Sequence, residues 1–151
     1  MSTLWLSAEE QRAWRSLQLM QMQLATVLSQ RLTPFDLSLQ DYFLLSHLSE
    51  HDGQMRIVEL ARDLGLEKSR ASHQISRLCA RGLLKKQRCD DDRRGYFAVL
   101  TSSGQRLVQK VAPHHVRDVR ENFIAHTTSG ELSSLAKMAS RVIDHLEQET
   151  I

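Results

Sequence analysis

The residues best suited to chemistry lie between positions 68 and 80, and their types suit the reading of nucleic acid. At helical spacing, Ala71, Ile75 and Leu78 would form the inner face of a helix. Polar residues share the outer and flanking faces: Lys68, Ser69, Arg70, Ser72, His73, Gln74 and Arg77. Arginine can make paired hydrogen bonds to guanine and glutamine to adenine, and a major groove about 12 Å wide admits a helix. The pattern favours a DNA-reading helix, with an ordinary solvated polar face as the alternative.

A second charged group follows at positions 90–95, where three aspartates precede two arginines and a glycine. It separates two short runs of strand-like composition, 83–88 and 96–100. This arrangement predicts a β-hairpin with a charged tip. The mixture of acids and arginines is unusual for a simple phosphate clamp, and a hydrophilic turn without a DNA contact is the alternative.

The other reactive side chains form no recognisable catalytic or metal-binding motif. Adjacent histidines on a helix point about 100° apart, and no cysteine or carboxylate completes an evident cluster with the histidines at 114, 115, 126 and 145. Cys79 and Cys89 form no Cys-x-x-Cys pair, so a structural role is favoured over a redox role. Glycine-rich phosphate loops and catalytic-triad patterns are also absent from the sequence. We expect a protein that is not an enzyme and that uses no metal or cofactor.

The charge is unevenly distributed along the chain. Its formal net charge is only +2. Between Arg56 and Arg94, however, eleven lysines and arginines face six acids, an excess of five positive charges that leaves −3 for the remainder. A basic centre between slightly acidic ends is expected when one part of a protein faces phosphate and another faces protein.

Helical patterns surround this centre. Ser7 and Glu10 form a capping-box pattern that opens an amphipathic helix, Pro34 ends it, and Ser38 offers the start of the next helix. A short helical segment over 57–64, a turn at Gly65 and the helix over 68–80 then form a helix-turn-helix pattern.

The last third of the sequence predicts two more helices, over 101–123 and after a capping box at Thr128 and Glu131. The final helix carries an uninterrupted apolar stripe: Leu132, Leu135, Ala136, Ala139, Val142, Ile143 and Leu146. This is more amphipathic helix than a winged-helix domain of about 60–70 residues needs, so we expect a symmetric partner to cover it. The alternative is that the stripe closes the core of a monomer.

The order of these elements and three stretches of sequence resemble the MarR (multiple antibiotic resistance regulator) family. The stretches are IVELARDLGLEKSRASHQIS at 57–76, RLCARGLL at 77–84 and DRRGYFAVLTSSG at 92–104. The resemblance implies a mainly α fold with a small β-hairpin wing. It also implies a triangular homodimer, in which the first, fifth and sixth helices of both subunits intertwine and two lobes grip one pseudo-palindrome of double-stranded DNA.

The resemblance assigns further roles to residues of this chain. Arg93 or Arg94 would enter the minor groove from the wing tip, where the potential is strongly negative, and Asp92 would brace the loop by pairing with the other arginine. A small aromatic or anionic effector would bind between the dimerisation helices and the DNA-binding lobe. The residues that could line its pocket are Trp14, Met20, Met22, Tyr42, Phe43 and His115, with ordinary core packing as the alternative.

The 151 residues are expected to form a single domain, with a winged helix-turn-helix lobe over 33–100 and dimerisation helices over 1–32 and 101–151. Residues 1–6 lack the features of a signal peptide, and no apolar run approaches the ~20 residues that span a bilayer, so a cytoplasmic location is expected. Together these features predict a sequence-specific transcriptional regulator, with repression as the expected mode. The alternative is a winged-helix module that binds protein, or that binds DNA without sequence preference.

Overall fold

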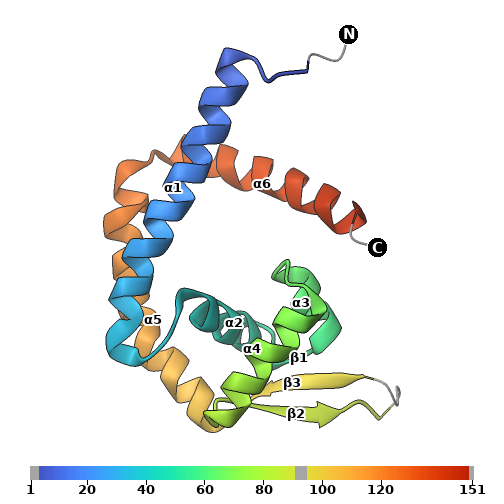
Figure 1. Ribbon diagram of the computed structural model, residues 1–151. Coiled ribbons are helices and arrows are strands. Elements are labelled where there is room, and N and C mark those ends of the chain that lie inside the picture. Colours follow the sequence, from blue (N-terminus) through green and yellow to red (C-terminus); the bar gives the residue numbers. More distant parts are fainter. Residues whose placement is uncertain (1–3, 91–94, 150–151) are drawn as a thin grey trace.

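The computed structural model, which describes residues 4–90 and 95–149, is mainly helical with a small antiparallel sheet (Figure 1). This confirms the predicted fold class. The elements in chain order are α1 (Ala8–Leu32), the 3₁₀ helix η1 (Thr33–Phe35), α2 (Leu39–Glu50), β1 (Gln54–Arg56), α3 (Ile57–Asp63), α4 (Lys68–Ala80), β2 (Leu84–Arg88), β3 (Tyr96–Leu100), α5 (Ser102–Asn122), η2 (Ile124–His126) and α6 (Ser129–Glu149).

The helices begin where the sequence predicts. Ser7 accepts a hydrogen bond from the backbone N–H of Glu10, whose carboxylate accepts one from the N–H of Ser7 at 2.7 Å. Thr128 and Glu131 form the same reciprocal pair before α6. These bonds satisfy amides that the first turn of a helix leaves without a partner, so local sequence alone sets these boundaries.

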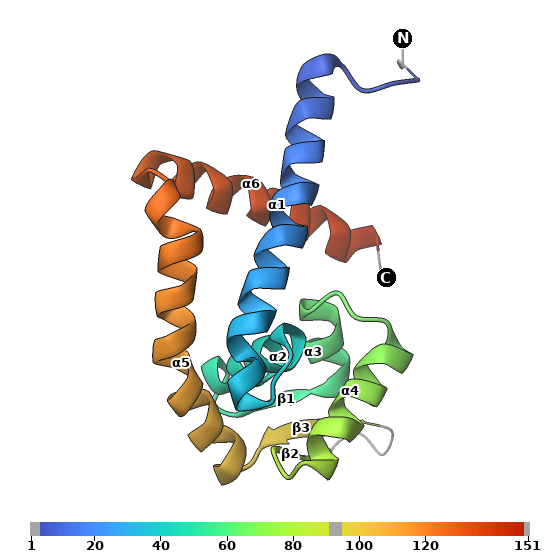
Figure 2. The ribbon, with the colours of Figure 1, turned by 60° about the vertical axis from the view of Figure 1, so that its left-hand side comes forward.

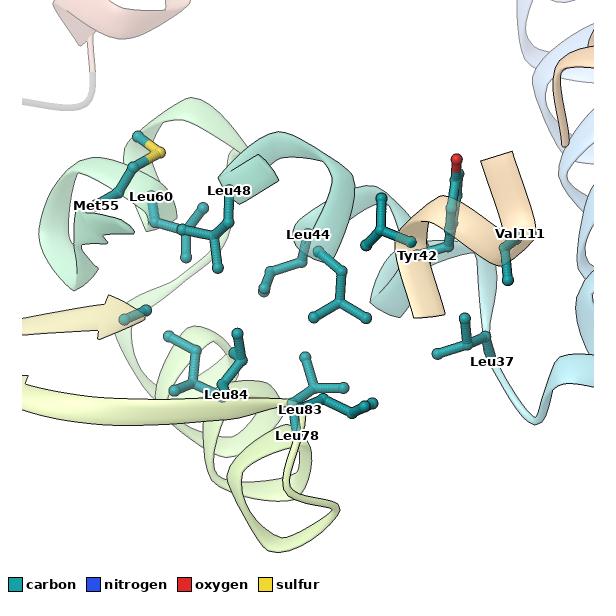
Figure 3. Packing of buried hydrophobic residues seen from close by; sticks show 14 of the residues in the cluster. Leu37, Tyr42, Leu44, Leu48, Met55, Leu60, Leu78, Leu83, Leu84 and Val111 are labelled. Atoms are coloured by element: carbon teal, nitrogen blue, oxygen red, sulfur yellow. The ribbon is translucent and has the colours of Figure 1, made fainter. Parts of the chain in front are cut away.

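One apolar core holds the central elements together (Figure 3). Leu44, Leu45 and Leu48 of α2 are fully buried and meet side chains from α3, α4, the sheet and the first half of α5. Leu32 of α1 and Val111 of α5 belong to the flanking helices and reach into the same core. The elements from η1 to β3 therefore pack against one another around a core that one chain supplies, and α5 packs against the same core.

The sheet has one strand more than the sequence predicts. β1 and β2 each pair antiparallel with β3, which gives the strand order β1-β3-β2. In the β1–β3 pair, Met55 lies opposite Ala98. A three-residue strand is too short to show the alternation of polar and apolar residues that identifies strands in sequence, and its pairing partner lies far along the chain.

The start of α5 is tied directly to the turn that follows α4. The Thr101 hydroxyl donates to the carbonyl of Gly82 at 2.7 Å and accepts from the N–H of Gly104 at 3.0 Å, while the N–H of Thr101 donates to the carbonyl of Leu83. A Cβ added to Gly104 would lie 2.3 Å from the Leu83 oxygen. Only glycine permits this approach, so the Leu-Thr-x-x-Gly pattern forms the joint between the central lobe and the long C-terminal helices.

The long helices extend away from the core. α1 lies beside α5, and α6 leaves the end of α5 at a steep angle (Figures 1 and 2). Only Leu28 and Leu32 of α1 are buried, and none of the described residues of α6 is. Thus the predicted apolar stripe of the last helix does not close the core of this chain.

Candidate nucleic-acid interface

The helix-turn-helix consists of α3, a tight turn and α4. Gly65 in the turn has a φ of 62°, a left-handed conformation that favours glycine. The N–H of Leu66 donates to the carbonyl of Ala61 at 2.8 Å and closes the turn. Ala71, Ile75 and Leu78 are buried, as predicted, so the inner face of α4 is fixed against the core.

The opposite face of α4 is exposed and carries most of the predicted site residues. These are Lys68, Ser69, Arg70, Ser72, His73 and Arg77. They lie on one rigid helix, which presents cationic and hydroxyl groups together at the surface of the molecule. Such a face can contact phosphates with its lysine and serines and base edges with its arginines.

Gln74 is placed differently from the prediction, which put it on the outer and flanking faces of this helix. Its side chain is buried, and its amide Nε2 donates to the Asp41 carboxylate of α2 at 3.1 Å. Gln74 lies beside Ile75 and three residues after Ala71, at the edge of the inner face. Helical periodicity leaves such an edge position undecided, and the contact with α2 buries it.

Asp41 of α2 contacts two side chains of α4, and sequence reasoning missed this residue. Besides Gln74, its Oδ1 lies 3.6 Å from Nη2 of Arg77, whose side chain is 57% exposed. One buried carboxylate thus fixes the inner edge of α4 and approaches a cation on its outer face. The sequence signals Asp41 only as a residue in the first turn of α2, and its partners lie 33 and more residues away.

The hairpin next to α4 is confirmed as β2 and β3. The N–H of Cys89 donates to the carbonyl of Gly95 at 3.0 Å, which closes the hairpin at the ends of its described strands. Asp92, Arg93 and Arg94 lie outside the described residues. Lys85 and Lys86 of β2 are exposed and add cations near α4 that the sequence shows only as part of its basic centre.

The two cysteines differ in exposure. Cys89 is buried and Cys79 is half-buried.

The six residues suggested for an effector pocket do not converge on one cavity. Trp14, Met22 and Phe43 are more than half exposed. Tyr42 of α2 and His115 of α5 do meet, with ring centroids 4.6 Å apart. Met20 instead lines a cavity of about 340 Å³ between α1 and the segment after α5.

Burial changes the acid–base properties of the Tyr42–His115 pair. It raises the pKa of the Tyr42 phenol above its ordinary value, with a smaller effect from the negative charge of Glu50. It lowers the pKa of the His115 imidazole, against an opposing effect of Asp118. Both groups therefore favour their neutral forms, and the contact between α2 and α5 is an uncharged one.

Within residues 4–90 and 95–149, no helix is both long and apolar enough to cross a membrane.

Comparison with known proteins gives a consistent assignment. Residues 35–95 match the family model described as the MarR family. AbsC, a MarR family transcriptional regulator from Streptomyces coelicolor, is 41% identical with a TM-score of 0.89, over 97% of this chain and 99% of that chain. Sco3205, a MarR family transcriptional regulator from the same organism crystallised in complex with DNA, is 33% identical with a TM-score of 0.88, over 96% and 92% of the two chains. A MarR protein from Peptoclostridium difficile shares the fold at 18% identity, with a TM-score of 0.79 over 99% and 96% of the two chains.

Proposed function

Because the chain belongs to the MarR family of transcriptional regulators, we propose that it is a sequence-specific repressor that binds a pseudo-palindromic operator as a homodimer. In this proposal residues 33–100 form the DNA-binding lobe, and residues 1–32 and 101–151 form the dimerisation helices. The supporting observation is the exposed polar face of α4, held on a buried inner face in a fold shared with a relative crystallised in complex with DNA. A regulator of this kind works where the DNA is, so we propose a cytoplasmic location.

The outer face of α4 is proposed to enter the major groove. Arg70 would read base edges, since an arginine can make a bidentate contact to guanine. The other exposed residues of this face would contact phosphates or bases beside it: Lys68, Ser69, Ser72, His73 and Arg77. Gln74 is left out of the base-reading set because its amide is held by Asp41 inside the lobe.

The wing is proposed to supply the second contact. Arg93 or Arg94 would enter the minor groove with Asp92 as the brace, as predicted from the family resemblance. The exposed Lys85 and Lys86 of β2 would add phosphate contacts. These contacts provide affinity, while Arg70 provides sequence choice.

The homodimer is supported by apolar surface that one chain leaves uncovered. On α6, Val142, Ile143 and Leu146 are each more than half exposed, and Leu19 and Met22 of α1 are as well. Exposed apolar residues in a row along a helix mark a contact surface. A second copy of the chain can cover these helices in an isologous dimer and place two α4 helices about one turn of DNA apart.

Release by a small aromatic or anionic effector is part of the proposal. Tyr42 and His115 meet where α2 of the lobe contacts α5. A molecule bound there would change operator affinity only if it bound the DNA-competent and DNA-incompetent states with different affinity. Titration of the protein–operator complex with a panel of small aromatic acids tests this, and complexes that persist at every concentration would count against release.

The DNA proposal is tested by fluorescence anisotropy with a duplex selected from a random pool by the purified protein. We expect the selected duplex to bind about 10³-fold or more tightly than a scrambled duplex, with affinity that falls steeply as salt rises. An affinity ratio near one would favour the alternative, a winged-helix module that binds protein or that binds DNA without sequence preference.

Substitution of Arg70 separates base reading from phosphate contact. R70A should lower the affinity ratio between selected and scrambled duplexes, because it removes a base contact. The matched variant K85A should weaken binding to both duplexes about equally and reduce the salt dependence. If R70A leaves the ratio unchanged, the assignment of α4 as the sequence-reading helix is wrong.

A further inference from the structure

A group of metal-ligating side chains lies away from the outer face of α4, where the end of α2 meets the end of α3. His47 belongs to the last turn of α2, His51 caps that helix, and Asp63 is the last residue of α3. Each offers one ligand atom, and these atoms all lie within 4.8 Å of one another. Two imidazoles and a carboxylate are a donor set used for zinc and related divalent metals.

Two of the three donors already have the spacing that a metal ion requires. Nε2 of His47 lies 3.1 Å from Oδ2 of Asp63. Ligands bonded to a tetrahedral ion at about 2.0–2.1 Å lie about 3.3 Å from one another. An ion could therefore bridge this pair with little movement of either helix. The ring of His51 lies against that of His47, with centroids 4.4 Å apart, and its ligand atom lies within 4.8 Å of the other two.

The tautomer of His51 is also suited to metal binding. Its Nδ1 lies 2.7 Å from the carbonyl oxygen of His47. A carbonyl only accepts hydrogen bonds, so Nδ1 carries the hydrogen and Nε2 keeps a lone pair. A backbone carbonyl that orients a histidine in this way is common around protein-bound metals, where it fixes the ring and strengthens the ligand.

The surroundings leave a path for the ion and for water. The side chains of His47 and Asp63 are 20% and 25% exposed, and His51 is exposed. Arg62 is a cation beside this cluster, and its Nη2 lies 3.7 Å from Oδ1 of Asp63, which leaves Oδ2 to face His47. Three protein ligands with an open position match a site in which water completes the coordination.

We propose that His47, His51 and Asp63 bind one Zn²⁺ ion, or a similar first-row divalent metal, per chain. The ion would take the place of the hydrogen between Nε2 of His47 and Oδ2 of Asp63, and the His47 ring would then carry its one hydrogen on Nδ1. It would join the end of α2 to the end of α3, two residues before Gly65 in the turn of the helix-turn-helix. No metal site is expected from the sequence, because the histidines of its C-terminal third have no evident cysteine or carboxylate partner. The three donors come together only through a contact between residues 16 positions apart.

Zinc binding to the untagged full-length protein, stripped with a chelator, tests the proposal. Competition with a chromophoric chelator should give one Zn²⁺ per chain. H51A and D63N should each weaken binding by at least about tenfold, because each removes a ligand. H126A serves as the matched control, since it removes an exposed histidine far from the cluster, and should bind as tightly as the wild type.

A thermal unfolding measurement separates metal binding from a merely structural contact between α2 and α3. Zn²⁺ should raise the unfolding midpoint of the wild type and of H126A, because a ligand that binds the folded state stabilises it, and should raise the midpoints of H51A and D63N clearly less at the same zinc concentration. Far-UV circular dichroism without metal confirms that these variants are folded. A wild-type protein that binds zinc no more tightly than both variants, or a midpoint that zinc raises equally in all four proteins, overturns the proposal.

Discussion

The central lobe and the helices that flank it differ in how far one chain buries their apolar residues. Leu44, Leu45 and Leu48 of α2 are completely buried in the lobe, whereas Val142, Ile143 and Leu146 of α6 are more than half exposed. A buried Leu or Ile side chain contributes about 1.5–3 kcal/mol relative to an exposed one. The lobe is therefore stable through its own contacts, while α6 gains this free energy only when something covers it.

This contrast separates the parts of the proposed activity. The lobe holds α4 on a buried inner face and presents its polar face, so in this proposal a single chain would read one half-site. Placement of two such faces on one operator would depend on the helices whose apolar residues one chain leaves exposed. The joint at Thr101 and Gly104 connects the two regions, because it ties the start of α5 to the turn that follows α4.

The largest effect is expected from a charge placed on the uncovered stripe. I143D should convert a dimer to a monomer, because it would place an unpaired carboxylate in an apolar interface. Loss of the second lobe should weaken operator binding by about 10²-fold or more. Light scattering gives the mass and anisotropy the affinity. K137D, which also introduces an aspartate but at an exposed position on the opposite side of α6, is the control, and a dimeric I143D would contradict the contrast between the regions.

A smaller effect is expected at the joint. G104A should destabilise the fold by about 1–3 kcal/mol, because the new Cβ would lie 2.3 Å from the backbone oxygen of Leu83. G130A is matched to it, since nothing lies within 4 Å of a Cβ there. In α6 that change should be neutral or stabilise by up to about 1 kcal/mol. Urea denaturation measures both, and equal stabilities would show that the joint is not tightly packed.

The two edges of α4 should respond differently to truncation. Q74A should destabilise the lobe by about 1–3 kcal/mol, because it removes a partner of the buried Asp41 carboxylate. R70A should leave stability within about 0.5 kcal/mol of wild type, since Arg70 is exposed and makes no contact needed by the core. Denaturation curves measure stability, and anisotropy measures the ratio of selected to scrambled DNA. A specificity loss in Q74A without a stability loss would restore Gln74 to the base-reading face.

The smallest effect is expected from pH, at the contact between the lobe and α5. The pKa of His115 is lowered by burial, so the unfolded chain binds more protons near and below the ordinary pKa of 6.5. Stability from this group is therefore fully present above that pH and is lost as pH falls through the lowered value. Thermal unfolding is measured between about pH 7.5 and about pH 5.5, which lie on either side of that pKa. As the pH is lowered over this range, the unfolding midpoint should fall less for H115Q than for the wild type. H126Q should follow the wild type, and identical slopes for all three would contradict the shift.

Much of the fold could be predicted because its signals are local. The caps at Ser7, Ser38 and Thr128 depend on residues three positions away, and the inner face of α4 follows from helical periodicity. The apolar stripe of α6 is read in the same way. These features require no knowledge of which segments meet in space.

The features that sequence reasoning missed all depend on contacts between distant segments. β1 is recognisable only through its pairing with β3. The burial of Gln74 is set by Asp41, 33 residues earlier, and the cluster of His47, His51 and Asp63 joins two helices. Periodicity within one helix cannot specify such partners. Asp92, Arg93 and Arg94 lie outside the described residues, so their roles stay predictions.

The central claim is that two chains cover each other's exposed helices and so place two sequence-reading helices on one operator. Selection of DNA from a random pool with the purified protein tests this claim most directly. Sequencing of the bound fraction should give two inverted half-sites whose centres are about one turn of DNA, 10–10.5 base pairs, or a multiple of it apart. The same duplex should bind two chains. Enrichment of a single unsymmetrical site bound by one chain, or no enrichment at all, would contradict the claim.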